Sequence, residues 1–241
     1  MKAKQAIDIT GGTAIKAFLF DIDGTLLKCF GAGKQSLSRA CKEVFGTVGR
    51  MDAVDFQGKT DPLILLESLN VMGFGEEEIH RNLDALKERY FHHLEIGMGD
   101  GAAILLPGVE RLLERLSRHD GILSGLLTGN FRESARIKLG RFDLNRFFPF
   151  GVFGDDAADR NEMPAIARRL IRETFGFDIG FGDTIIIGDT VYDIECAKSV
   201  GAISVSVGTG WADRYALLSL GPDHYFDDLN DTENVIESIL G

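Results

Sequence analysis

Three short polar segments each follow directly on an apolar run of the sequence. They are Asp21-Ile22-Asp23-Gly24-Thr25, Thr128-Gly129-Asn130 and Gly188-Asp189-Thr190-Val191-Tyr192-Asp193. If the apolar runs are parallel strands, their carboxyl ends meet at one edge of a sheet, which is where ligands bind in open α/β sheets. The sequence therefore predicts a single pocket that contains four carboxylates and a threonine hydroxyl.

Four carboxylates in one pocket repel each other strongly. Two like charges about 4 Å apart cost roughly 4 kcal/mol at an effective dielectric constant near 20. Such a cluster either takes up protons or holds a cation. Because the available ligands are oxygens, with no neighbouring Cys or His, they favour a hard ion, and a site that handles phosphate favours Mg²⁺ over Ca²⁺.

Two other interpretations of Asp21–Thr25 fit the sequence less well. Asp and Gly cluster in ordinary turns, but a plain turn does not explain why Thr128 and Asp189 occupy corresponding positions after other strands. An EF-hand calcium loop is excluded because the acidic spacing stops at Gly24 and no Glu closes the loop.

Apolar runs alternate with segments of helical period over most of the chain. The predicted strands are Ile15–Phe20, Ile122–Leu127, Phe150–Phe153, Thr184–Ile187 and Ile203–Val207. The predicted helices between and after them are Gly108–His119, Arg132–Leu139, Pro164–Phe175, Tyr192–Val200 and Trp211–Leu220. This alternation predicts an α/β fold whose parallel sheet is covered on both faces.

One stretch interrupts the alternation. Residues 30–106 show helical patterns, over 33–45, 62–72 and 76–94, and no convincing buried strand. We therefore expect a helical subdomain at 30–106, inserted into a core made of 1–29 and 107–241. Residues 1–13 are expected to be a loosely held extension.

The amino-acid composition limits the classes of molecule that the protein is expected to bind. The chain of 241 residues carries 26 Lys and Arg against 37 Asp and Glu, a net charge of −11. This charge disfavours nucleic acid and anionic lipid as partners. Three widely spaced cysteines predict reduced thiols, and no apolar run is long enough for a membrane span. These features predict a cytoplasmic protein and leave its oligomeric state, monomer or homodimer, open.

On these motifs the sequence resembles the haloacid dehalogenase superfamily, in particular its phosphoglycolate-phosphatase-like branch. The resemblance covers roughly 14–29 and 107–210, and residues 30–106 occupy the place of that branch's helical cap. It implies a three-layer Rossmann-like core and an active site with bound Mg²⁺. Asp21 would be the nucleophile that forms an aspartyl-phosphate. Asp23 would act as general acid and then as base, with its backbone carbonyl on the metal.

The resemblance also implies roles for the later motifs. Asp21 and Asp189 would supply side-chain ligands to the metal, with Asp193 behind them. Thr128, with Gly129 and Asn130, would hold the transferring phosphoryl group, helped by the N-terminus of the helix that follows.

The sequence departs from the family pattern at one position. The family places a lysine before the fourth strand, but no lysine lies between Lys138 and Lys198. Arg160 is the best candidate to replace it, with a different reach and a bidentate grip on phosphate. Lys59, in the cap, is a candidate substrate contact; Gly58-Lys59-Thr60 is not a P-loop, because Ala53 stands where its first glycine is required.

The resulting expectation is a Mg²⁺-dependent phosphatase that acts on a small organic phosphomonoester. A haloacid dehalogenase would need no acid at Asp23, and a phosphonatase would similarly lack it. A β-phosphoglucomutase-type phosphomutase keeps both aspartates and stays open as an alternative. A catalytically retired binding protein would be expected to have lost the acidic residues that are present here.

Overall fold

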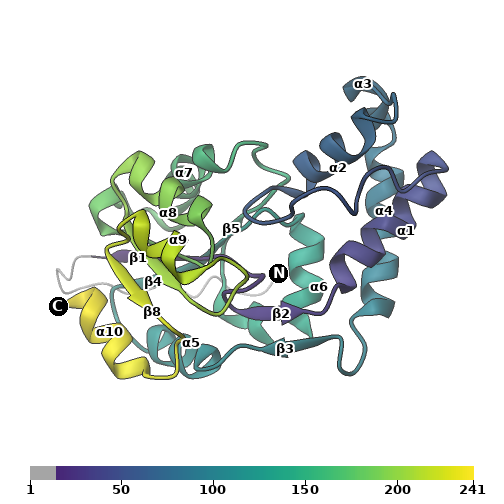
Figure 1. Ribbon diagram of the computed structural model, residues 1–241. Coiled ribbons are helices and arrows are strands. Elements are labelled where there is room, and N and C mark those ends of the chain that lie inside the picture. Colours follow the sequence, from purple (N-terminus) through teal and green to yellow (C-terminus); the bar gives the residue numbers. More distant parts are fainter. Residues whose placement is uncertain (1–14) are drawn as a thin grey trace, which may run out of the picture.

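Parallel strands in the order β5-β4-β1-β6-β7-β8 form the main sheet of the computed structural model, which describes residues 15–241 (Figure 1). Their bounds are β1 Lys16–Phe20, β4 Ile122–Leu127, β5 Gly151–Val152, β6 Thr184–Gly188, β7 Ile203–Val207 and β8 His224–Phe226. The five predicted strands are all present, and β8 is an additional edge strand. The extension expected at 1–13 lies outside the described residues.

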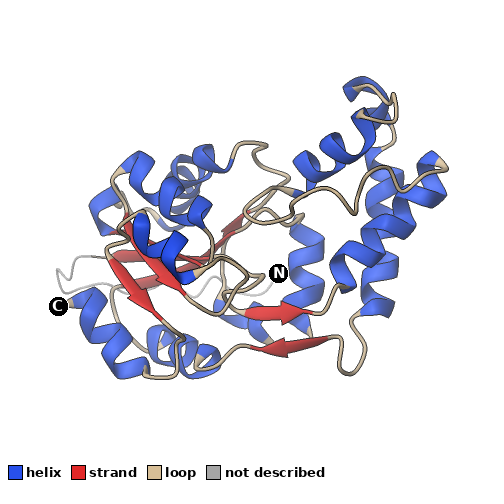
Figure 2. Ribbon diagram, in the orientation of Figure 1, coloured by secondary structure: helices blue, strands red, loops and turns tan. Residues whose placement is uncertain are grey.

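Both faces of this sheet are buried by helices, as the apolar strands require (Figure 2). In β1, Phe18 and Phe20 pack into one apolar cluster, while Ala17 and Leu19 pack into the other. The first cluster is shared with α5 (Val109–Ser117), α6 (Arg132–Gly140) and α10 (Thr232–Leu240). The second is shared with α7 (Met163–Phe175) and α8 (Val191–Val200). The predicted three-layer α/β fold is confirmed.

A separate group of helices lies beyond the carboxyl ends of the strands, to the right of the sheet in Figure 1. It consists of α1 (Ala32–Phe45), α2 (Asp61–Asn70), α3 (Glu76–Arg81) and α4 (Leu83–Gly97), and we call these four helices the helical lobe. The helix expected over 76–94 is divided into α3 and α4 at Asn82, whose backbone leaves the helical region.

Residues 30–106, where no convincing buried strand was expected, contain one short strand that is not buried. Ala103–Leu105 forms β3, which pairs antiparallel with β2 (Leu27–Cys29). Three residues are too few to show a period of two, and Ile104 is exposed, so the segment lacks the pattern of a buried strand. The β2–β3 pair joins the lobe to the core; the domain bounds at 29/30 and 106/107 stay a prediction.

The remaining elements close the core. They are α9 (Arg214–Ser219), shorter than the predicted helix, and the 3-10 turns at Leu144–Phe147, Arg160–Glu162 and Phe181–Asp183. Within residues 15–241, no helix combines the length and the apolarity needed to cross a membrane.

Candidate active site

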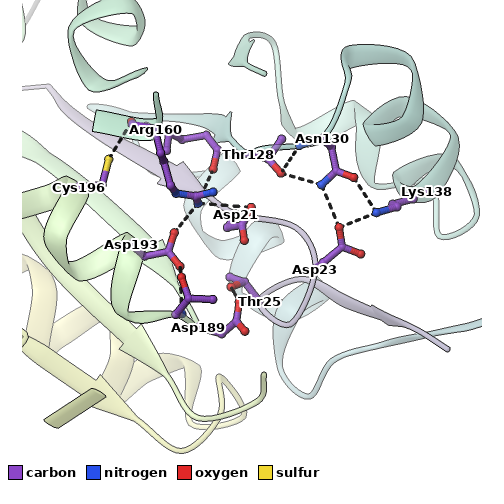
Figure 3. A network of polar contacts seen from close by, with 12 residues as sticks. Asp21, Asp23, Thr25, Thr128, Asn130, Lys138, Arg160, Asp189, Asp193 and Cys196 are labelled. Atoms are coloured by element: carbon purple, nitrogen blue, oxygen red, sulfur yellow. Dashed lines mark hydrogen bonds and ion pairs between the residues drawn. The ribbon is translucent and has the colours of Figure 1, made fainter. Parts of the chain in front are cut away.

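The three polar segments meet at one edge of the sheet. β1 lies between β4 and β6, so the segments after these neighbouring strands flank Asp21 on either side. Figure 3 shows Thr128 on the β4 side of Asp21 and Asp189 on the β6 side. The convergence expected from the sequence is therefore present, because the strand order puts the chain's three motifs side by side.

The turn after Asp21 depends on glycine for two reasons. Gly24 has φ +90°, a left-handed conformation that residues with a side chain rarely adopt. A β-carbon at this position would also lie 2.3 Å from Oδ2 of Asp189. Gly24 thus lets Asp189 approach the turn closely, and Thr25 completes the contact by donating its hydroxyl to Asp189 Oδ1 at 3.1 Å.

Asp21, Asp189 and Asp193 form a buried acidic cluster in which one carboxylate oxygen of each lies within 4.8 Å of the others. Burial raises the pKa of Asp21 to about 6; Arg160 opposes this shift, and Asp193 and Asp23 add to it. Burial likewise raises the pKa of Asp189 well above its usual range, with Asp193 and Asp21 adding to the effect. The fold thus concentrates negative charge that favours protons or a cation.

Asp193 and Asp189 differ in whether both of their carboxylate oxygens have hydrogen-bond or ion-pair partners. Asp193 uses both oxygens: Oδ1 pairs with Arg160, and Oδ2 accepts from the backbone N–H and hydroxyl of Thr190 at 3.0 and 2.6 Å. Oδ2 of Asp189 is buried and has no hydrogen-bond partner among the described residues. An orphaned carboxylate oxygen beside Asp21 fits the oxygen-rich donor set of a divalent cation, and Asp193 fits a supporting role.

Arg160 is buried beside this cluster. Its guanidinium pairs with Asp193 and lies 3.6 Å from Asp21, between Nη2 and Oδ1. Burial opposes the charge of Arg160, but Asp193 and Asp21 raise its pKa overall. The structure thus buries Arg160 and brings it close to Asp21.

Asp23 points away from the cluster, toward residues that follow β4 (Figure 3). The Nδ2 group of Asn130 donates to Asp23 Oδ2 at 2.9 Å and to Thr128 Oγ1 at 2.8 Å. The two aspartates of the first motif therefore have different surroundings, although they are separated by one residue. Two carboxylates with different neighbours can take different chemical roles.

Sequence reasoning missed Lys138 as a site residue. It lies on α6, and its Nζ contacts Asp23 Oδ2 and Asn130 Oδ1, both at 2.6 Å. Burial disfavours its charge, but Asp23 and other nearby groups raise the pKa of Lys138 overall. Its position in the second turn of a predicted helix, next to Ile137 and Leu139, gave no signal of function, since lysines on helices are usually exposed.

The helical lobe docks directly on the loop after β4. The backbone N–H of Asp61, at the start of α2, donates to the carbonyl of Gly129 at 2.7 Å. The Asp61 carboxylate accepts from the backbone N–H of Phe131 at 2.8 Å and from the Ser134 hydroxyl at 3.3 Å. Burial raises the pKa of Asp61 to about 6, against the opposing effect of Lys138.

This docking corrects one expectation. The N-terminus of α6 was expected to help hold a phosphoryl group, but the N–H groups of Phe131 and Arg132 are bound by the carboxylates of Asp61 and Asp155. The positive end of the α6 dipole thus serves to fasten a lobe residue and a core residue. Thr128 and Gly129, which precede this helix, are left to face the pocket.

A cavity of about 570 Å³ lies between the lobe and the sheet edge. Its walls include all the predicted site residues except Asp193: Asp21, Asp23, Lys59, Thr128, Gly129, Asn130, Arg160 and Asp189. Lys138 lines it as well. The lobe side includes Lys59, whose ammonium is paired with Glu67 at 2.5 Å. The volume suits a small organic molecule.

Curated proteins resemble the chain over nearly its whole length. A phosphoglycolate phosphatase of Synechococcus elongatus is 25% identical, and the match covers 94% of this chain and 99% of that protein. A phosphoglycolate phosphatase of Pseudomonas syringae pv. tomato is 24% identical, with 90% and 78% covered. A pyrophosphatase, PpaX, of Oceanobacillus iheyensis is 22% identical, with 92% and 97% covered.

Solved structures share the fold. A crystal structure of a predicted phosphoglycolate phosphatase from Haemophilus somnus superposes with a TM-score of 0.69 at 21% identity, covering 94% of this chain and all of that one. A hydrolase from Pseudomonas syringae gives a TM-score of 0.70 at 22% identity, covering 93% and 99%. At these identities the likeness concerns the architecture.

The family assignment comes from a sequence-family model. The model of haloacid dehalogenase-like hydrolases matches residues 18–207, which include the end of β1 with the two aspartates that follow it, the whole helical lobe and the segments after β4 and β6. This match covers most of the chain and agrees with the fold and with the relatives. The chain belongs to the haloacid dehalogenase-like hydrolase family.

Proposed function

We propose that this protein is a Mg²⁺-dependent phosphatase that hydrolyses a small organic phosphomonoester through an aspartyl-phosphate on Asp21. The observation that carries the proposal is the different surroundings of Asp21 and Asp23. Asp21 lies among carboxylates beside Arg160, whereas Asp23, in the same cavity, contacts Asn130 and Lys138. A nucleophile and a separate acid are what a two-step phosphoryl transfer through the protein requires.

In the first step, an Asp21 oxygen attacks phosphorus while the bond to the leaving oxygen breaks. Asp23 gives a proton to that oxygen as the leaving alcohol forms. In the second step, water attacks the phosphorus of the aspartyl-phosphate, Asp23 accepts a proton from the water, and Asp21 is released with inorganic phosphate. Arg160, Thr128 and the backbone N–H groups of Gly129 and Asn130 would bind the phosphoryl oxygens.

Asp21, Asp189 and the backbone carbonyl of Asp23 would hold the metal ion, with Asp193 supporting them. The chemistry of Mg²⁺ at such a site is to offset the charge of the phosphoryl group and keep the nucleophile ionised. The orphaned Oδ2 of Asp189 supports this assignment. A bound cation would also offset part of the protein's net charge of −11, which by itself would repel an anionic substrate.

The lobe would exclude water from the aspartyl-phosphate. Asp61 ties α2 to the loop after β4, and Lys59 stands next to this contact on the cavity wall. We propose that Lys59 contacts the part of the substrate that is not transferred. The cavity volume of about 570 Å³ supports a metabolite rather than a protein or polymer as substrate.

A phosphate-release screen tests this function. The panel includes phosphoglycolate, sugar phosphates and other small phosphomonoesters, together with pyrophosphate because one relative is a pyrophosphatase. We expect release that stops when divalent metal is chelated and returns with Mg²⁺, and that is abolished in Asp21→Asn. Phosphatase activity retained in that variant would rule out the covalent mechanism. Sugar phosphates primed with a hexose bisphosphate test the alternative phosphomutase.

A further inference from the structure

The ammonium group of Lys138 is buried between the sheet core and the helical lobe. The side chain is 6% exposed and forms an ion pair with Asp23. A methyl group added to Gly33, in the first turn of α1, would lie 3.6 Å from Lys138 Nζ, so the lobe covers this charge directly. Burying an ammonium group costs several kcal/mol unless it is paired, which indicates that the contact with Asp23 is specific.

Lys138 determines which atoms donate and which accept in the hydrogen bonds among Lys138, Asn130 and Asp23. An ammonium group can only donate, so Asn130 must present its carbonyl oxygen to Lys138, at 2.6 Å. The Nδ2 group of Asn130 then faces the other way and donates to Asp23 Oδ2 at 2.9 Å. Lys138 therefore fixes the orientation of the Asn130 amide as well as contacting Asp23 itself.

The two oxygens of Asp23 are consequently not equivalent. Oδ2 accepts from Lys138 and from Asn130. Among residues 15–241, no group donates to Oδ1. During the reaction, when Asp23 carries the transferred proton, one of its oxygens holds that proton and the other accepts hydrogen bonds. Two donors on Oδ2 make it the accepting oxygen, and the proton is left to Oδ1.

We propose that Lys138 is a positioning residue which, with Asn130, holds Oδ2 of Asp23 and reserves Oδ1 for proton transfer to and from the substrate. The proposal rests on the phosphatase function proposed above and deepens it. When the phosphorus–oxygen bond of the ester breaks, the leaving oxygen keeps the electron pair and takes the proton of Oδ1. When water attacks the aspartyl-phosphate, its proton returns to the same oxygen.

Leaving groups of different basicity separate this role from a structural one. An alkyl phosphate such as glycerol 2-phosphate needs a proton on its leaving oxygen, whereas 2,4-dinitrophenyl phosphate does not. We would compare wild type, Lys138→Met and Lys138→Arg, measuring kcat and KM with the alkyl ester and the pre-steady-state burst of dinitrophenolate. Lys87→Met is the matched control, because Lys87 pairs with Asp155 across the same lobe–core boundary without contacting Asp23.

General acids contribute about 10²- to 10⁴-fold to rate. We expect Lys138→Met to lower kcat for the alkyl ester at least ~100-fold, with KM changed less than ~3-fold and the dinitrophenolate burst rate less than ~5-fold. Lys138→Arg, which keeps a cationic donor, should recover at least ~10-fold of the lost kcat. Lys87→Met should behave as wild type with both esters.

Equal losses with the two esters, or no loss, would overturn the positioning role while leaving the phosphatase function intact. A wild-type protein that hydrolyses neither ester would overturn both. If Lys138→Met does not fold, Asn130→Leu replaces it, since this variant removes the second donor to Oδ2. The same selective loss is expected there, and an unselective one contradicts the proposal.

Discussion

Arg160 lies 3.6 Å from Asp21, between Nη2 and Oδ1, in a chain whose family resemblance predicts a lysine near this position. The guanidinium also pairs with Asp193, so it links the proposed nucleophile to the carboxylate behind the proposed metal ligands. A guanidinium presents its donors in a rigid planar fork, whereas a lysine ammonium is a compact point charge on a flexible stem. Arginine is therefore suited to this site by geometry as well as by charge.

Replacement of Arg160 should affect both activity and stability. Arg160→Met leaves Asp193 and Asp21 buried without their cation, and breaking a buried pair costs about 3–5 kcal/mol. We expect a lower thermal midpoint and a loss of kcat/KM of at least ~100-fold. Arg160→Lys keeps the charge and should be intermediate in both measurements. Kinetics like those of wild type in Arg160→Met would remove this residue from the site.

The acidic cluster should make the metal-free protein more stable in mild acid. Asp21 has a pKa of about 6 in the folded chain, raised above its ordinary value, so the folded state binds the proton more tightly than the unfolded state. Its favourable contribution is complete below the unfolded pKa and is lost as the pH rises through about 6. Asp189 and Asp61 shift in the same direction.

Thermal unfolding with chelator should therefore show a midpoint that falls as the pH rises from about 5 to about 8. Asp21→Asn should make this slope shallower. Mg²⁺ should stabilise wild type more at about pH 8 than at about pH 5, because it competes with protons for the same oxygens. Asp52→Asn is the control, as this carboxylate is 97% exposed. A midpoint that rises with pH would contradict the expected direction.

Strands that are buried on both faces were accessible to sequence analysis because their apolar runs are continuous. β1, β4, β6 and β7 were predicted to within one residue. β8 has half-buried residues and lies at an edge of the sheet, and β2 and β3 are three residues long. Such segments lack the pattern that identifies a strand, and their pairing is decided by neighbours that the local sequence does not reveal.

The residues of the candidate site also differ in whether the sequence alone could reveal them. Asp21, Thr128 and Asp189 follow strands directly, so the strand prediction already placed them together. Arg160 was predicted as a site residue because the sequence has no lysine where the family pattern places one. Lys138 lies in the last turn of α6, and its contact with Asp23 depends on how α6 packs beside the lobe. No spacing in the sequence encodes that packing.

Asp61 should fasten the lobe over the cavity. Its carboxylate accepts hydrogen bonds from Phe131 and Ser134, and hydrogen bonds to charged groups contribute about 1.5–3 kcal/mol. We expect Asp61→Ala to enlarge the radius of gyration in small-angle scattering and to lower kcat/KM by ~10-fold or more. Asp61→Asn retains an accepting oxygen and should be milder. An unchanged radius of gyration together with unchanged kinetics would show that the lobe is held by other contacts.

The substitution Gly129→Ala tests sterically how closely the lobe docks on the loop after β4. A β-carbon there would lie 2.1 Å from the carbonyl oxygen of Lys59 and 2.9 Å from the Cα of Thr60, both backbone atoms of the lobe. The backbone of Gly129 is not in the left-handed region, so alanine strains only this contact and not the loop itself. We expect Gly129→Ala to leave the core folded but to keep the lobe from seating fully. Scattering should show a larger radius of gyration, and KM should rise. Gly176→Ala is a poor control because its φ is +80°, whereas Gly182→Ala meets nothing within 4 Å and is matched for backbone type. A crystal structure of Gly129→Ala with the lobe docked as in wild type would refute the steric argument.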